Sequence, residues 1–255
     1  MNNGNKDGIV FGAESAHPSQ KVKQAARKSL KSLMRGNEMN FVFNSQISLG
    51  DSLPDFTQDQ IKSEVMLFSA DYHFAKQVAG PLTLAFLDAL PEDWKEAKDL
   101  IIDSRVHMLM KDFFYPCIPG FHHDDVPRRA SDGQPDYFNP AYRSEHVMAL
   151  VNGNICPTRF ALGEATFPDV EPGEVYYRVW HPMVEEKIKS GELISQDAVS
   201  NRLIFFNDRT WHEGVIARED GWRWFIRASR QTHRKTTNEI RRQVQVYLQN
   251  PMAGW

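Results

Sequence analysis

The amino-acid sequence predicts a mainly β protein with flanking helices, an α+β arrangement around an antiparallel barrel or jelly roll. The second half of the chain holds many short strand-like runs, Gly, Pro, Asn and Asp separate these runs, and the first hundred residues have mostly helical spacing. Many short strands at modest spacing are typical of antiparallel barrels and jelly rolls. A length of 255 residues suits one large domain, so we expect residues 1–255 to form a single domain.

Helical patterns dominate residues 1–100, which we expect to form a mostly helical N-terminal part. Residues 21–35 place apolar side chains on one helix face and basic side chains on the rest. This basic face could contact nucleic acid or anionic lipid, but the formal net charge of −3 favours a solvated face. The run QVAGPLTLAFLDAL has apolar residues at spacings of three and four, and Pro91 opens another helix with acidic residues in its first turn.

Strand-like runs begin near residue 101. They read RVHMLMKDFFYP, HVMALVNG, TRFALGEATF, GEVYYRVW, NRLIFFND, TWHEGVIA and GWRWFIRAS. A helical stretch, MVEEKIKSG, interrupts them after Pro182, and the tail NEIRRQVQVYLQ has helical spacing. We therefore expect a β core over residues 101–232 and a C-terminal helix within 233–255.

Composition disfavours nucleic acid or a membrane as partner and indicates a reducing compartment. The near-balance of charge predicts no general affinity for nucleic acid or an anionic membrane. The two cysteines form no CxxC pair and cannot make a disulfide framework. The N-terminus lacks a charged segment followed by an apolar run, and no apolar stretch approaches the roughly 18 residues of a membrane span. We expect a reduced, cytoplasmic protein, and leave open whether it forms a homo-oligomer.

Residues 120–125, Gly-Phe-His-His-Asp-Asp, contain a candidate metal motif. Side chains two positions apart share one face of a strand, so His122 and Asp124 point together while His123 and Asp125 point the other way. His212, in the run NDRTWHEG, is the candidate third ligand. Two imidazoles and one carboxylate leave three positions open on a metal, which suits iron(II). A His-x-Asp pair alone occurs often by chance, and the residues after His212 give this assignment its weight.

Two arginines follow His212 in a run that should be a buried strand. Arg223 lies 11 positions after His212 and Arg227 lies 15 positions after it, and both share a strand face with Ser229. A buried arginine is costly unless a carboxylate or several acceptors meet it, and a planar guanidinium can hold a carboxylate through two parallel hydrogen bonds. The partner could be a dicarboxylate ligand or a structural Asp or Glu.

Taken together, these residues resemble the iron(II)/2-oxoglutarate-dependent oxygenase superfamily, whose pattern is His-x-Asp, a distant His, and an Arg about ten to fifteen residues further on. The resemblance covers roughly residues 101–232 and identifies no subfamily. It implies a double-stranded β-helix core that binds Fe(II) through His122, Asp124 and His212. It also implies a dioxygenase, most often a hydroxylase, that uses 2-oxoglutarate and O₂ and releases succinate and CO₂. Halogenases of this superfamily lack the carboxylate ligand, so Asp124 argues against halogenation.

The resemblance assigns the cosubstrate to the strand after His212. Arg223 matches the taurine-dioxygenase-like group, in which the first arginine holds the far carboxylate of 2-oxoglutarate. Arg227, which begins an Arg-x-Ser sequence ending at Ser229, matches a phytanoyl-hydroxylase-like branch in which that arginine has the same role. The choice stays open, with Arg223 preferred. The preceding Gly-Phe favours His122 over His123 as the first ligand, which makes His123 a candidate substrate contact.

Other candidate substrate contacts lie around the metal motif. The long polar segment 127–146 directly follows it and could cover the site, with Arg128, Tyr137 and Arg143 contacting a small polar or anionic substrate. Its alternative is a solvated surface loop. Arg105 lies on an upstream strand that could also line the pocket.

Two other functions would fit the same metal motif. A cupin-like isomerase or hydrolase could use the three ligands with zinc, without 2-oxoglutarate and without need of the buried arginines. A non-enzymatic binding protein on a degenerate barrel would not need an intact set of ligands.

Overall fold

A computed structural model describes residues 40–115, 117–139, 141–171, 173–242 and 248–249, which belong to one compact unit beginning at Asn40. The helix predicted over residues 21–35 lies outside the described residues. Among the described residues, no helix has the length and apolar content needed to cross a membrane.

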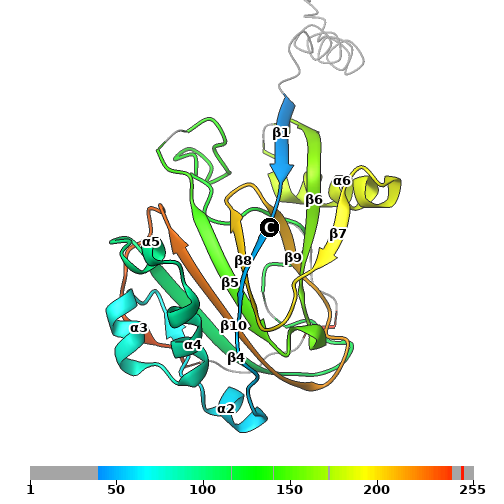
Figure 1. Ribbon diagram of the computed structural model, residues 1–255. Coiled ribbons are helices and arrows are strands. Elements are labelled where there is room, and N and C mark those ends of the chain that lie inside the picture. Colours follow the sequence, from blue (N-terminus) through cyan, green and yellow to red (C-terminus); the bar gives the residue numbers. More distant parts are fainter. Residues whose placement is uncertain (1–39, 116, 140, 172, 243–247, 250–255) are drawn as a thin grey trace, which may run out of the picture. The chain divides into compact units, whose positions relative to one another are not determined.

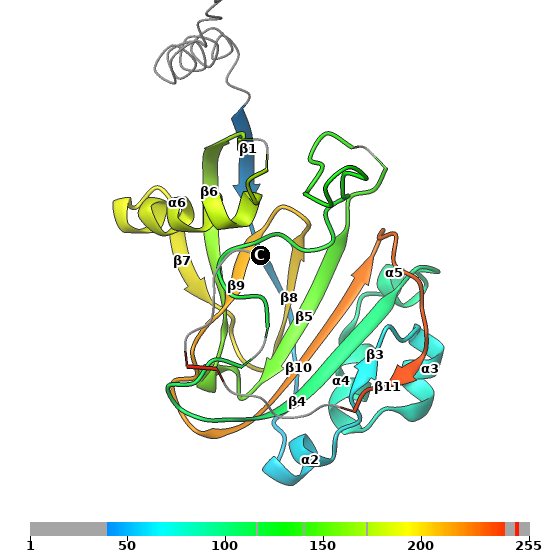
Figure 2. The same cartoon turned by 180° about the vertical axis from the view of Figure 1, so that it is seen from behind.

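Two antiparallel sheets form the body of this unit (Figures 1 and 2). The five-stranded sheet has the order β2 (Ser48–Ser52), β8 (Arg202–Asn207), β5 (Glu145–Val151), β10 (Gly221–Arg230) and β4 (Ile101–Leu109). The four-stranded sheet has the order β1 (Asn40–Ser45), β6 (Thr158–Pro168) and β7 (Ile194–Asp197), and β9 (Trp211–Gly214) also pairs with β6. The predicted mainly β fold with flanking helices is confirmed.

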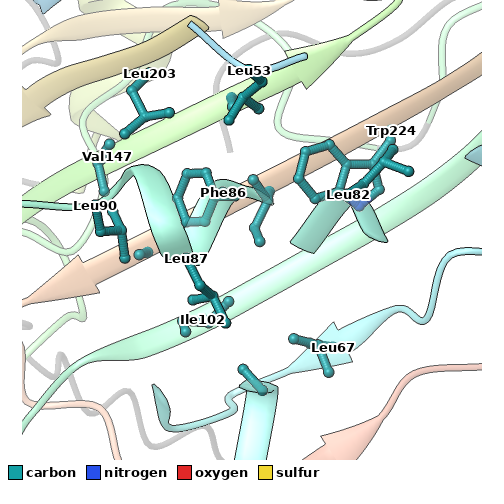
Figure 3. Packing of buried hydrophobic residues seen from close by; sticks show 14 of the residues in the cluster. Leu53, Leu67, Leu82, Phe86, Leu87, Leu90, Ile102, Val147, Leu203 and Trp224 are labelled. Atoms are coloured by element: carbon teal, nitrogen blue, oxygen red, sulfur yellow. The ribbon is translucent and has the colours of Figure 1, made fainter. Parts of the chain in front are cut away.

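Four short helices pack against one face of the five-stranded sheet (Figure 1). They are α2 (Gln58–Ser63), α3 (Tyr72–Val78), α4 (Pro81–Ala89) and α5 (Glu92–Lys95). Figure 3 shows Phe86 and Leu82 of α4 against Trp224 of β10. Because side chains alternate along a strand, the even-numbered residues of β10 meet the helices and its odd-numbered residues turn to the opposite face.

The long helix α6 (Tyr176–Ser190) corrects one prediction. The run GEVYYRVW was expected to be a strand, but its last five residues, Tyr176–Trp180, form the beginning of α6. Tyr176, Tyr177, Trp180 and Val184 are all buried in one aromatic cluster with residues of β1, β6 and β9. Their spacing of one, three and four positions makes a helical stripe, and burying that stripe outweighs the β preference of the individual residues.

Both ends of the described chain also differ from prediction. The expected mostly helical N-terminal part is wrong at β1 and β2, which complete the two sheets. The expected C-terminal helix is wrong at β11 (Glu239–Ile240), which pairs with β3 (Leu67–Phe68). The rest of that predicted helix lies largely outside the described residues. The backbone N–H and C=O groups of these strands pair with strands that are distant in the sequence. The local spacing of apolar residues does not reveal such a partner.

Candidate metal centre

His122, Asp124 and His212 lie together between the two sheets, with potential ligand atoms all within 4.8 Å of one another. His212 is on β9, and His122 lies in the segment between β4 and β5. The two histidines exchange backbone hydrogen bonds, with His122 N donating to His212 O at 3.0 Å and His212 N donating to His122 O at 3.2 Å. This isolated antiparallel bridge fixes two ligands that are distant in sequence.

The outer nitrogen of each ring is tied to the backbone. His122 Nδ1 lies 2.8 Å from the carbonyl of Gly120, and His212 Nδ1 lies 2.9 Å from the carbonyl of Thr210. Since a carbonyl only accepts, each Nδ1 carries the proton and donates it. The Nε2 of each ring, the atom that binds a metal, is thereby turned toward Asp124.

Both Nε2 atoms face the Asp124 carboxylate. His212 Nε2 lies 3.1 Å from Oδ2, and His122 Nε2 lies 3.7 Å from Oδ1. Burial and the neighbouring His212 lower the pKa of His122 to about 4, so this ring is neutral at pH 7. A divalent cation among these groups would be attracted by the carboxylate and bound by the two Nε2 atoms. The donor set therefore fits a divalent metal ion.

Arg227 holds the same carboxylate from the other side. Its Nη1 donates to Asp124 Oδ2, and its Nη2 lies 3.8 Å from Asp125 Oδ2. Burial alone would raise the pKa of Asp124, but Arg227 and His212 hold that pKa well below its usual range. Asp124 is therefore ionised and oriented before any metal arrives.

The three residues open into a cavity of about 510 Å³ between the sheets. One wall is the odd-numbered face of β10, which contributes Arg223, Phe225 and Arg227. In the antiparallel register, Arg223 lies opposite His107 of β4 and Arg227 lies opposite Asp103. The strand alternation expected from the sequence thus turns both arginines into the cavity.

Arg223 differs from Arg227 in its partners. Its side chain is 9% exposed, and its Nη1 donates to the carbonyl of Cys156. Within the described residues it has no carboxylate partner, and its buried Nε has no hydrogen-bond acceptor. Arg227 is paired with Asp124, whereas Arg223 is a buried cation without an anion.

Ser229 and His123 do not line this cavity. Ser229 Oγ lies 2.8 Å from His146 Nδ1, in the sheet interior. His123 Nδ1 lies 2.8 Å from the Tyr137 hydroxyl, and its ring packs on Trp211 with centroids 3.8 Å apart. The possible metal ligands include His122 and not His123. Residues 121–125 form no strand apart from the bridge at His122, and Asp125, expected to face away with His123, lines the cavity.

The other candidate substrate residues divide in the same way. Arg128 is exposed, and Arg143 is half-exposed and donates to both oxygens of the buried Asp208 at 3.1 Å. Neither lines the cavity, and Tyr137 lies with His123 in the aromatic cluster. Arg105 does line the cavity.

Two further arginines, Arg234 and Arg241, line the cavity but were not predicted from the sequence. Both come from the segment after β10, which was expected to be helical. Arg234 Nη2 donates to Asp103 Oδ2 at 2.7 Å. A cationic segment after the last core strand was the only available signal, and it does not indicate which side chains turn inward.

A second group of possible ligands, His181, Glu185 and Glu213, lies nearby. Arg159 donates to both carboxylates and so already supplies one positive charge to this group. His181 Nδ1 accepts the backbone N–H of Phe121 at 2.9 Å. The group therefore supports the metal segment rather than offering a second metal site.

Comparisons with known proteins give distant similarities. No family model and no curated protein matches this chain. EvdO2 from Micromonospora carbonacea var. aurantiaca, solved in complex with 2-oxoglutarate, is 10% identical with a TM-score of 0.34, covering 86% of this chain and 87% of its own. HygX from Streptomyces hygroscopicus, solved with iron bound, is 14% identical with a TM-score of 0.36, covering 82% and 88%. TM-scores this low do not establish a shared fold, so the side chains carry the functional argument.

Proposed function

We propose that the protein is an iron(II)- and 2-oxoglutarate-dependent dioxygenase that hydroxylates a C–H bond of a small polar or anionic substrate and releases succinate and CO₂. One observation carries the proposal. Two imidazole Nε2 atoms and an ionised carboxylate converge beside a buried arginine that has no carboxylate partner. The two facing antiparallel sheets support a double-stranded β-helix as the core that holds these groups.

The metal would be held by His122, Asp124 and His212. Two nitrogen ligands and one oxygen ligand leave open positions for a bidentate cosubstrate and O₂, the arrangement typical of non-haem iron(II) oxygenases. When bound, iron and 2-oxoglutarate supply the oxidising chemistry. The chain itself orients the two histidines through the Gly120 and Thr210 carbonyls and keeps both side chains buried at the cavity wall.

Arg223 is the arginine best suited to the far carboxylate of 2-oxoglutarate. Its guanidinium is buried, lines the cavity and lacks an anion, and a carboxylate would satisfy both its charge and its unpaired Nε. Arg227 is already committed to Asp124. A cupin-like zinc enzyme would leave Arg223 without a role, and therefore fits the cavity less well.

Succinate formation tests the proposal. Purified protein given iron(II), 2-oxoglutarate, O₂ and ascorbate, which supplies the two electrons that a substrate would otherwise give, should convert 2-oxoglutarate to succinate slowly, and His212→Ala should abolish this turnover. Arg218→Gln is a matched control, because Arg218 pairs with Asp197 outside the cavity. Activity supported by zinc alone, with no succinate formed, would favour the cupin-like enzyme.

A further inference from the structure

The cavity carries more positive charge than the proposed cofactors can balance. Among its described lining residues, five are arginines and four are carboxylates. One carboxylate, Glu213, is already paired with Arg159, which does not line the cavity. Iron(II) and doubly charged 2-oxoglutarate would cancel one another. An excess of about two positive charges then remains in a site that is partly screened from water, which favours an anionic occupant.

This excess is concentrated at Arg105 and Arg241. Arg105 has no ion pair within the described chain, and its side chain contacts the Tyr115 hydroxyl. Arg241 Nη2 lies 3.8 Å from Asp103 Oδ1, but Asp103 already accepts a shorter bond from Arg234. Arg241 Nε is buried with no hydrogen-bond acceptor among the described residues.

The two guanidiniums are also close enough to repel one another. Burial and the positive charge of Arg105 together lower the pKa of Arg241. Asp103 offsets this repulsion only in part, because it already pairs with Arg234, so an anion bound between the two guanidiniums would be favourable.

The backbone fixes both side chains in place. Arg105 lies on β4 opposite Phe225 of β10. Arg241 directly follows β11, its backbone N donates to Met66 O at 2.7 Å, and its guanidinium lies over the Phe68 ring at 4.6 Å.

We propose that Arg105 and Arg241 bind an oxyanion group of the substrate, so that the substrate is an organic anion carrying a carboxylate, sulfate or phosphate ester. The proposal rests on the proposed function, which supplies the oxidation of the other end of the substrate. Planar guanidiniums bind such oxygens through paired, charge-assisted hydrogen bonds. The anionic end is held at β4 and β11, and the uncharged remainder extends within the same cavity toward His122, Asp124 and His212.

Calorimetric titration of the full-length protein, loaded anaerobically with iron(II) and 2-oxoglutarate, tests this site. The probes are sulfate, methyl phosphate and acetate. At least one should bind, and Arg105→Gln and Arg241→Gln should each weaken that binding at least about tenfold, as expected for loss of a charged hydrogen bond. Arg218→Gln should match the wild type. Arg241→Lys, which keeps the charge but loses the planar fork, should weaken binding less than Arg241→Gln.

Three results would overturn the proposal. The first is that no probe binds, and the second is that the wild type and both glutamine variants bind the probes equally well. The third is that the glutamine variants lose 2-oxoglutarate binding, which would place the cosubstrate at Arg105 and Arg241. Failure of the proposed function is distinguishable, because it would appear as no 2-oxoglutarate binding by the wild type. The anion titration of the metal-free protein would then still test the site.

Discussion

Arg227 Nη1 donates a hydrogen bond to Asp124 Oδ2, the same oxygen that lies 3.1 Å from His212 Nε2. One carboxylate is thus held by a guanidinium while it faces two imidazoles. This contact separates the roles of two arginines that share a strand face. Arg227 orients a metal ligand, and Arg223 has a free charge to offer a ligand.

Arg227→Gln should therefore weaken iron(II) binding by roughly ten- to a hundredfold, the range found when a residue orienting a metal ligand is removed. Measurement of the iron dissociation constant checks this, with Arg218→Gln as control. Unchanged iron affinity together with lost 2-oxoglutarate binding would instead make Arg227 the cosubstrate arginine.

Arg223→Gln should weaken the binding of 2-oxoglutarate and leave the binding of iron(II) unchanged. Loss of the paired hydrogen bonds should raise the 2-oxoglutarate dissociation constant by at least about tenfold, because each charged hydrogen bond contributes about 1.5–3 kcal/mol. Iron affinity should stay close to that of the wild type, because Arg223 does not contact the three ligands. Isothermal titration of the iron-loaded variant measures both quantities, and an unchanged 2-oxoglutarate affinity would refute the assignment.

His123 should be dispensable for metal binding. His123→Phe keeps an aromatic ring against Trp211 but loses the bond to Tyr137. We expect it to bind iron as the wild type does and to lose about 1–3 kcal/mol of unfolding free energy, because the Tyr137 hydroxyl loses a buried partner. His122→Phe should lose iron. If His123→Phe loses iron while folded, the ligand assignment is wrong.

Asp71 should stabilise the fold in a pH-dependent way. Its side chain caps α3 by accepting the Phe74 N–H at 2.8 Å, and this hydrogen bond lowers the pKa of Asp71. The folded pKa lies below the unfolded one, so the carboxylate's extra stabilisation is complete above the unfolded pKa and is lost as pH falls through the folded pKa. Asp71→Ala should cost about 1 kcal/mol at neutral pH and less in acid. Urea unfolding measures both values, and an equal cost at both pH values would contradict the sign.

The sequence predicted those parts of the site that depend on a single strand. The two-residue period turns Arg223 and Arg227 of β10 to one side. It does not apply at residues 121–125, which form no strand apart from the bridge at His122, and Asp125 lines the cavity against that expectation. Local patterns also identified the helices over residues 58–95 and most core strands.

Features that depend on pairing between distant segments were not predictable. Nothing near Arg241 indicates that the strand before it pairs with Leu67–Phe68, or that Arg105 shares its cavity. Ser229 has the expected strand face, but His146 of the neighbouring strand takes its hydroxyl. Arg143 looked like a substrate contact because its partner, Asp208, lies far along the sequence.

The most direct test of the account is an anaerobic spectroscopic titration of the protein with iron(II) and then 2-oxoglutarate. Chelation of iron by the 2-oxo acid should produce a visible charge-transfer band that saturates at one equivalent of each, is absent in His212→Ala and requires excess 2-oxoglutarate in Arg223→Gln. A wild-type protein that binds iron at His122, Asp124 and His212 but shows no such band at any 2-oxoglutarate concentration would contradict the proposed function.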